Sequence, residues 1–355
     1  MRLIMLSRAK ETMKKLFHRL LKRNDLPLPS RITSETVIQH REHILAGGRR
    51  FKYPMQYARY KLVINAIAIS IGALIIVLVI GWWQLYPAQN TSEFMYRITK
   101  VIPVPVAVVD GQLVLYSDYL MKYRSSINYL EQKEQLSLKT DDGKRQVEYV
   151  KQQSMRDAIA DAYALKLSKN LGISVSDSEF EGFLKEQRYS SDGEISQQTY
   201  DAVILDYYGW SPDEYRHVTE SKLLRQKVAY AMDKVALSTT DSITSTLKND
   251  PKTDLKNLAT TISSQAGKKA VYGVSGWVPK TNQDGGLATE ASKLKKLQVS
   301  SAIKSTIGDG YYIVRLLDIN DTQVNYEYIQ VPLTVFENDL NNILDSNKVQ
   351  KYISV

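Results

Sequence analysis

One uninterrupted apolar run dominates the hydropathy pattern of the chain. Residues 62–85, LVINAIAISIGALIIVLVIGWWQL, carry no charged side chain. A helix of that length measures about 36 Å, which exceeds the roughly 30 Å hydrocarbon core of a bilayer. A buried helix of a soluble domain is the alternative. Trp82, Trp83 and Tyr86 lie at the C-terminal end of the apolar run. Aromatic residues there are typical of a membrane interface, which favours a transmembrane segment.

Beyond this run, a linker is expected over residues 86–103, followed by a small β-hairpin. The strand-like segments Val104–Val109 and Leu113–Tyr116 flank a tight turn at Asp110, a combination typical of hairpins. Ser117 follows the second segment and is expected to cap a helix, because a serine side chain can accept a hydrogen bond from the first helical turn.

Further helices are indicated by their ends. A long helix from about Arg145 is expected to stop at Gly172, since glycine adopts the positive φ that follows many helices. Two capping boxes, each with serine and glutamate three positions apart, open the next helices: Ser176 with Glu179, and Ser211 with Glu214 beside Pro212. The last helix is expected to reach about Val235, which completes a helical domain over residues 104–235.

The pattern changes after a polar, threonine-rich break expected at Val235–Thr240. Residues 241–355 combine short helices with strands, which predicts a smaller α+β domain with a mostly antiparallel four-stranded sheet. The strands are expected at Ala270–Lys280, Ser300–Thr306, Gly310–Ile319 and Val324–Leu333. The helices are expected at Ser242–Leu247, Asp254–Ile262, Leu287–Leu297 and Phe336–Ile353.

Charge is distributed unevenly. The net charge of the chain is +9, and residues 1–61 hold 15 Lys/Arg against 4 Asp/Glu. The rest of the chain is close to neutral, so nucleic acid is not an expected partner. Positive charge on the N-terminal side predicts a basic cytoplasmic tail at 1–61 and an uncleaved, bilayer-spanning signal anchor at 62–85. The chain is then a single-pass cell-membrane protein with extracytoplasmic C-terminal domains.

The tail also contains an amphipathic segment. Between Arg8 and Arg23, apolar residues recur at helical spacing among cations: Met13, Leu16, Phe17, Leu20 and Leu21. Such a helix can bind an anionic leaflet. A solvated helix or an unstructured arm explains the same pattern equally well, and the sequence leaves these alternatives open.

Residue counts restrict the chemistry of the exported part. The chain has no cysteine and four histidines, and only His217 lies beyond the apolar run. Disulfides, thiolate nucleophiles and pairs of histidines are therefore excluded there. No metal site and no cofactor are expected, and His217, on a charged helix, is expected to be solvated.

Several motifs resemble a known family. The blocks VAVVDGQLVLYSDYLMKY, SKNLGISVSDSEFEGFL and YYGWSPDEYRHVTESKLLRQKVAY are similar to the N-terminal chaperone domain of the SurA, PpiD and PrsA group of exported foldases. The resemblance covers roughly Val104–Val235. It implies a helical chaperone domain that binds unfolded or nascent exported polypeptides.

In that family a parvulin-type prolyl isomerase domain usually follows. SGWVPK and KKLQVSSAIKSTIGDGYYIVRLLDIN resemble its second half, but its usual opening strand is not found ahead of Asp241. In a parvulin sheet the first and last strands lie together at the centre. Val324–Leu333 could fill the missing place in a permuted domain; an ordinary extra edge strand is the alternative.

The parvulin resemblance leaves enzymatic activity uncertain. Parvulins carry a histidine pair beside a cysteine or aspartate, whereas Tyr312 stands at one histidine position and Tyr328 at the other if the permutation holds. The acidic or thiol position falls near Ser263–Gln265, where neither type occurs. A phenol with a pKa of about 10 handles protons poorly at neutral pH, although its hydroxyl can donate a hydrogen bond.

Taken together, the residues favour a membrane-anchored chaperone or foldase with a weak or inactive isomerase domain. An active prolyl isomerase and an envelope scaffold with one fixed partner are the alternatives. Aromatic side chains are the candidates for contact with unfolded clients, with core packing as the alternative for each: Tyr119, Tyr207, Tyr208, Trp210 and Trp277.

Overall fold

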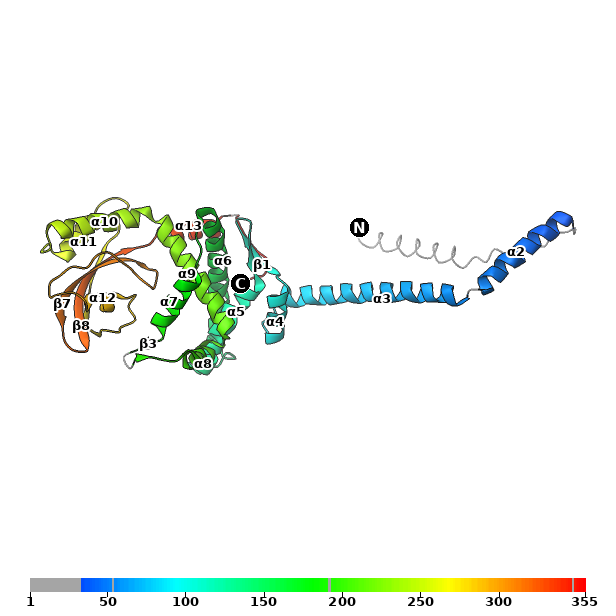
Figure 1. Cartoon of the computed structure of the whole chain (residues 1–355), viewed down its shortest axis with the longest axis horizontal. Coiled ribbons are helices and arrows are strands. Elements are labelled where there is room, and N and C mark those ends of the chain that lie inside the picture. Colours follow the sequence, from blue (N-terminus) through cyan, green and yellow to red (C-terminus); the bar gives the residue numbers. More distant parts are fainter. Residues whose placement is uncertain (1–32, 53, 191–192, 347) are drawn as a thin grey trace. The chain divides into compact units, whose positions relative to one another are not determined.

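The structure is a computed structural model that describes residues 33–52, 54–190, 193–346 and 348–355. The chain divides into two compact units, residues 1–80 and 81–355, and Figure 1 draws both. The described residues form helices and antiparallel sheets, which confirms the mixed helix and sheet class. The amphipathic segment Arg8–Arg23 lies outside the described residues.

The first unit contains α2 (Ser34–Lys52) and most of α3 (Pro54–Leu85). Within α3, Tyr60–Leu85 has a mean hydropathy of 2.9 and none of its most apolar window is buried. It is the one helix in the described part of the chain that is long and apolar enough to cross a membrane. The exposure of this segment is consistent with the predicted transmembrane helix, whose insertion in a bilayer stays a prediction.

The second unit begins with a helix where a linker was expected. Residues 86–103 contain α4 (Glu93–Val101), which is capped by Ser92. Met95, Tyr96 and Thr99 are buried. The linker prediction is wrong because the apolar residues on one side of this segment pack into the second unit.

The predicted hairpin is confirmed, and helices follow it. β1 (Pro105–Val109) pairs with β2 (Gln112–Leu115), and α5 (Tyr116–Gln132) follows directly, with Leu115 at its N-cap. Ser117 lies inside α5, so its predicted capping role is wrong. α6 (Asp141–Leu171) begins before Arg145 because Thr140 caps it, and it ends at Gly172 with φ 65°, as predicted.

Both predicted capping boxes are present. They open α7 (Asp177–Gln187) and α9 (Pro212–Met232), and in each the serine side chain and the glutamate bond to the partner's backbone N–H. Between them lie elements that were not predicted: the short strands β3 (Tyr189–Ser190) and β4 (Gly193–Glu194), and α8 (Gln197–Tyr208).

The prediction of a polar break at Val235–Thr240 is wrong. α10 runs without interruption from Lys234 to Asn249 and includes the expected helix Ser242–Leu247. The buried Thr240 hydroxyl donates to the Ala236 carbonyl at 2.8 Å, so this threonine is satisfied inside the helix rather than ending it. α11 (Leu255–Ser263) follows, close to its predicted bounds.

A four-stranded antiparallel sheet completes the fold, in the order β5-β8-β7-β6. Its strands are β5 (Val271–Pro279), β6 (Ile303–Lys304), β7 (Gly310–Ile319) and β8 (Gln323–Pro332). β8 pairs with β5 on one side and β7 on the other, so the alternative of an extra edge strand is wrong. α12 is shorter than predicted, at Leu287–Ala291.

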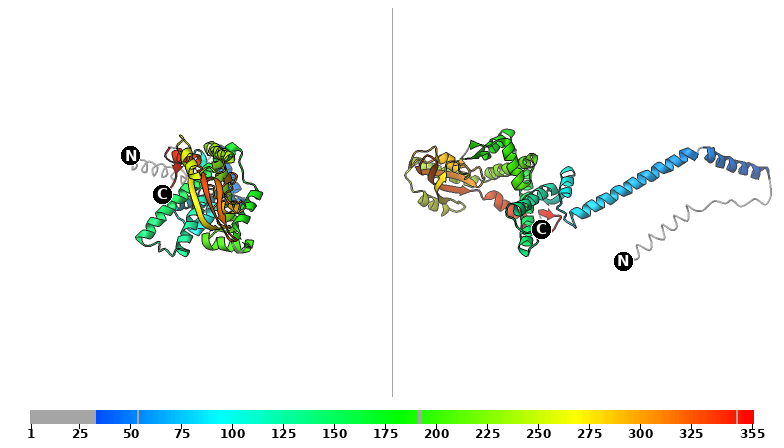
Figure 2. Two further views of the ribbon diagram at one scale, coloured as in Figure 1. Left: turned by 90° about the vertical axis from the view of Figure 1, so that its left-hand side faces the viewer. Right: turned by 90° about the horizontal axis from the view of Figure 1, so that it is seen from below.

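The end of the chain returns to the hairpin. α13 spans Val335–Leu344, and β9 (Val349–Lys351) pairs with β1 to give the sheet order β2-β1-β9. The prediction of a single helix over Phe336–Ile353 is therefore wrong. The C-terminus accordingly lies beside the first helices of this unit in Figures 1 and 2.

Two subdomains therefore make up the second unit. The helical subdomain has a core that joins α4, α5, α6 and α9 to Phe336, Leu340, Ile343 and Ile353 from the end of the chain. The predicted boundary of the domain 241–355 is thus wrong at its C-terminal end, because these residues belong to the helical core. The sheet subdomain has one cluster between its sheet and α10 and α11, and another beneath α12.

Candidate functional site

Three tyrosines gather on the face of the sheet that α12 covers. The register opposes Val314 to Tyr328 and Leu316 to Tyr326, and alternate residues of a strand share a face. The ring centroids of Tyr312 and Tyr328 are 5.6 Å apart, and those of Tyr326 and Tyr328 are 6.2 Å apart. The two candidate positions Tyr312 and Tyr328 are therefore adjacent.

Two of these hydroxyls are bonded to aspartates. Tyr312 Oη donates to Asp309 Oδ2 at 2.6 Å, and Tyr326 Oη donates to Asp284 Oδ2 at 2.6 Å. Burial, followed by the bond to the aspartate, raises the pKa of both phenols well above 10. At neutral pH each hydroxyl therefore keeps its proton and directs it toward a carboxylate.

Tyr328 lies over a glycine on the neighbouring strand. A Cβ atom at Gly273 would lie 2.4 Å from Cζ of Tyr328, so the ring occupies space that any other residue would fill. Tyr328 is only partly buried. Among the described residues its hydroxyl has no hydrogen-bond partner, which distinguishes it from Tyr312 and Tyr326.

Sequence reasoning missed both aspartates. It placed the acidic position near Ser263–Gln265, but Ser263 Oγ bonds to the backbone of Ala270 at 2.7 and 3.0 Å and ends a helix. The available signals were local: Asp309 precedes Tyr312 by three positions, and Asp284 stands ahead of a glycine pair. The cluster can donate hydrogen bonds, but it contains no imidazole to transfer protons at neutral pH.

A second aromatic group lies at the turn between α8 and α9. The rings of Tyr208 and Trp210 stack with centroids 4.9 Å apart, and Tyr207 lies 6.4 Å from Tyr208. Gly209, with φ 69°, ends α8 and reverses the chain between them. Tyr207 and Tyr208 are 43% and 40% exposed, so we call these three residues the aromatic patch.

The aromatic patch also offers polar groups. The indole Nε1 of Trp210 is buried and has no hydrogen-bond partner among the described residues. The ammonium of Lys133 lies 4.6 Å from the centroid of the Tyr207 ring. Lys133, which also forms an ion pair with Asp206, is the accessible polar group beside these rings.

The remaining candidates for client contact lie elsewhere. Tyr119 is 2% exposed and belongs to the core of the helical subdomain, so its predicted role in client binding is wrong. It packs edge-on against Tyr116 instead. Trp277 is 47% exposed on β5, an edge strand of the sheet.

Two larger cavities adjoin the sheet subdomain. One, of about 550 Å³, is lined by α7 and β3 on one side and by α12, β6 and the Asn282–Gly286 loop on the other. The second, of about 380 Å³, lies among α6, α9 and α13, with Ile307 and Gly308 from the sheet subdomain. Both mix polar and apolar side chains, as a site for varied polypeptides requires.

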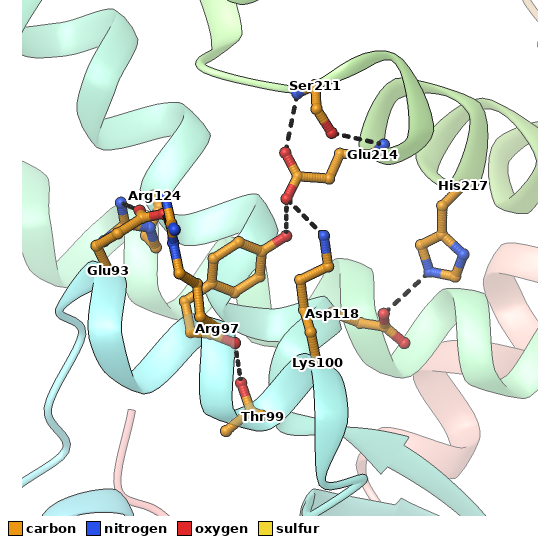
Figure 3. Close-up of polar contacts among 10 residues, drawn as sticks. Glu93, Arg97, Thr99, Lys100, Asp118, Arg124, Ser211, Glu214 and His217 are labelled. Carbon is orange, nitrogen blue, oxygen red and sulfur yellow. Dashed lines mark hydrogen bonds and ion pairs between the residues drawn. The ribbon is translucent and has the colours of Figure 1, made fainter.

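Glu214 joins α4 to the start of α9. Its carboxylate accepts hydrogen bonds from Tyr96 Oη at 2.6 Å, Lys100 Nζ at 3.0 Å and the Ser211 N–H at 2.9 Å. Figure 3 shows Lys100 and Ser211 converging on Glu214. This contact fixes α4 beside the aromatic patch, because Trp210 immediately precedes Ser211.

The single histidine of the second unit, His217, takes part in a polar pair. His217 Nε2 lies 3.0 Å from Asp118 Oδ1 (Figure 3), and its side chain is 55% exposed. The bond to Asp118 raises the pKa of His217. Within the described ranges no three histidine or acidic side chains are arranged to hold a metal ion.

Comparison with known proteins found a family match that runs from α3 into α9. Residues 55–229 match the family model described as the SurA-like N-terminal domain. None of the curated proteins matches the chain. This match over part of the chain supports a chaperone-like role in the cell envelope and is consistent with binding of unfolded polypeptides.

Proposed function

We propose that the chain is a membrane-anchored extracytoplasmic chaperone that holds unfolded exported polypeptides. The observation that carries the proposal is the match of residues 55–229 to the SurA-like N-terminal domain. The apolar segment Tyr60–Leu85 supports anchorage, with the basic tail in the cytoplasm. The partners are then unfolded or nascent polypeptides and the bilayer.

Clients bind at the aromatic patch in this proposal. Tyr207, Tyr208 and Trp210 present large, rigid apolar surfaces, which contact many sequences at a low cost in side-chain entropy. The nearby ammonium of Lys133 adds a polar contact that does not depend on the client's side chains. This combination suits weak, sequence-tolerant binding of extended segments.

The sheet subdomain is proposed to be a permuted parvulin-like module with little or no isomerase activity. Support comes from β8, which lies between β5 and β7. Isomerisation requires stabilisation of a twisted amide whose rotation barrier is about 18–20 kcal/mol. The phenols of Tyr312 and Tyr326 are bonded to aspartates, and Tyr328 alone retains a free hydroxyl.

The test is suppression of client aggregation by the full chain in lipid nanodiscs. Tyr208→Ser is compared with Tyr149→Ser, whose tyrosine is 55% exposed on α6 away from the aromatic patch. We expect the wild type and Tyr149→Ser to slow aggregation of a chemically unfolded protein, and Tyr208→Ser to lose about half of this effect or more.

Other outcomes would contradict the proposal. Equal loss in both variants would remove the aromatic patch as the client site. A wild type that fails to slow aggregation but captures one envelope protein would favour the scaffold alternative. Acceleration in a protease-coupled proline-peptide assay that disappears in Tyr312→Phe would favour the active isomerase.

A further inference from the structure

The short helix α4 exposes apolar side chains on its outer face. Phe94 is 69% exposed, Val101 81% and Ile102, at the C-cap, 58%. Phe94 and Val101 lie seven positions apart, which places them about 20° from each other around a helix with 3.6 residues per turn. Met95 and Tyr96 are buried on the opposite side. α4 thus has a covered apolar face and an uncovered one.

Polar contacts hold α4 firmly, so its outer face is not a frayed segment. Tyr96 and Lys100 bond to Glu214. Arg124 forms an ion pair with Glu93, and its guanidinium donates to the Thr91 carbonyl at 3.0 Å. Such contacts on both sides of the helix keep Phe94 and Val101 in a fixed position.

α4 lies a few residues after the end of the apolar helix α3. Leu85 is 5% exposed, and its carbonyl accepts a hydrogen bond from Tyr116 Oη at 2.7 Å. Asn90 bonds back to Gln84 through its backbone N–H and its side chain, both at 2.9 Å. The chain therefore folds back onto the last turn of α3 immediately before α4 begins.

Other residues of this stretch have the character of an interfacial segment. Trp82 and Trp83 are 56% and 53% exposed, and tryptophan favours the level of lipid headgroups. The side chain of Arg97 is 76% exposed and lies on the same side of α4 as Val101. A long cationic side chain beside apolar ones is typical of a helix that lies in a membrane surface.

We propose that the outer face of α4 binds the lipid surface from which α3 emerges. Phe94, Val101 and Ile102 enter the boundary between headgroups and acyl chains, and Arg97 reaches the phosphates. This inference rests on the proposed membrane anchorage, because the end of α3 brings α4 to the bilayer. Lipid is the occupant because α4 follows the end of the apolar helix within a few residues and combines exposed apolar side chains with a cation.

The test uses the full chain in vesicles of phosphatidylcholine and phosphatidylglycerol. The chain has no cysteine, so Val101→Cys, Ile75→Cys and Leu297→Cys each carry one environment-sensitive fluorophore. Leu297 is the control, at 62% exposure in the sheet subdomain. Nitroxide lipids, labelled near the headgroup or deep in the acyl chain, then quench a probe that contacts them.

We expect the shallow nitroxide to remove about half or more of the emission at position 101 and to leave position 297 unchanged. The deep nitroxide should quench the fluorophore at position 75. Quenching at 75 without quenching at 101 would overturn the inference and leave the anchor intact. A blue-shifted but unquenched probe at 101 would show that protein covers α4, which also overturns it. No quenching at either position would refute the anchorage itself.

Discussion

Glu214 combines a helix-capping role with a tertiary contact. Burial alone raises the pKa of this carboxyl, but hydrogen bonds from Tyr96, the Ser211 N–H and Lys100 together outweigh burial and bring the pKa below its ordinary value of 4.5. A carboxyl whose pKa is lower in the folded state stabilises the protein above its unfolded-state pKa. That contribution is lost as the pH falls through the folded-state pKa.

We therefore expect acid to weaken the wild type more than Glu214→Gln. At neutral pH the variant should be less stable by about 1 kcal/mol, because neutral hydrogen bonds replace charge-assisted ones. Below pH 4.5 the difference should shrink as the wild-type carboxyl is protonated. Urea unfolding of the full chain in detergent, measured at several pH values, tests this.

The control is Glu134→Gln, whose carboxylate is exposed and makes no described contact. It should follow the wild type at every pH. A constant difference between Glu214→Gln and the wild type down to strong acid would show that the carboxylate's charge does not contribute to stability.

At the scale of elements, one buried aspartate joins two helices. Asp233 is 1% exposed. Its Oδ1 accepts from the Ala236 N–H at 2.8 Å at the start of α10, and its Oδ2 accepts from the Thr334 and Val335 N–H groups at 2.8 and 3.2 Å at the start of α13. Elements far apart in the sequence thus share one cap.

Asp233→Ala should destabilise the protein by about 2–4 kcal/mol, because it leaves three N–H groups without their acceptor in a buried place. The matched control is Asp254→Ala. Asp254 is exposed and caps only α11, through one bond to the Asn257 N–H at 2.7 Å, so we expect a loss of about 1 kcal/mol. Thermal unfolding compares the two. Equal losses would contradict the joint cap.

The same contacts explain which elements the sequence could predict. Helices with strong local signals, such as the capping boxes before α7 and α9 and Gly172 after α6, were predictable because those signals act within a few residues. α4 and β9 were not, because each depends on a distant partner: Glu214 and β1. α10 was predicted only in part. A threonine-rich sequence resembles a loop, but a helix can contain it when the hydroxyls donate hydrogen bonds to backbone carbonyls one turn earlier.

Some site residues could likewise be predicted from the sequence, and others could not. The proximity of Tyr312 and Tyr328 could be anticipated, because the resemblance suggested that β8 enters the sheet. Asp284 and Asp309 could not, because loop conformation decides which acidic side chain reaches a phenol. Tyr119 was misassigned because an aromatic residue on an amphipathic helix has the same pattern whether it faces a client or the core.

At the scale of the whole molecule, orientation across the membrane is the main expectation. Residues 1–61 carry most of the excess positive charge, which favours their retention in the cytoplasm. In intact cells that express Thr36→Cys or Leu297→Cys, an impermeant maleimide should label only position 297. Disrupted cells should show labelling at both positions, which confirms that both thiols are reactive. Labelling of position 36 alone in intact cells would reverse the orientation.

The pairing of Ala107 with Lys351 has a consequence for biogenesis. β1 leaves the ribosome well before its neighbour β9, because α5 to α13 and the whole four-stranded sheet lie between them in the sequence. Pairing of such distant segments is slow, and incomplete cores expose sticky surface. The helical subdomain therefore cannot finish folding until β9 has been made, and before then its incomplete core is open to aggregation.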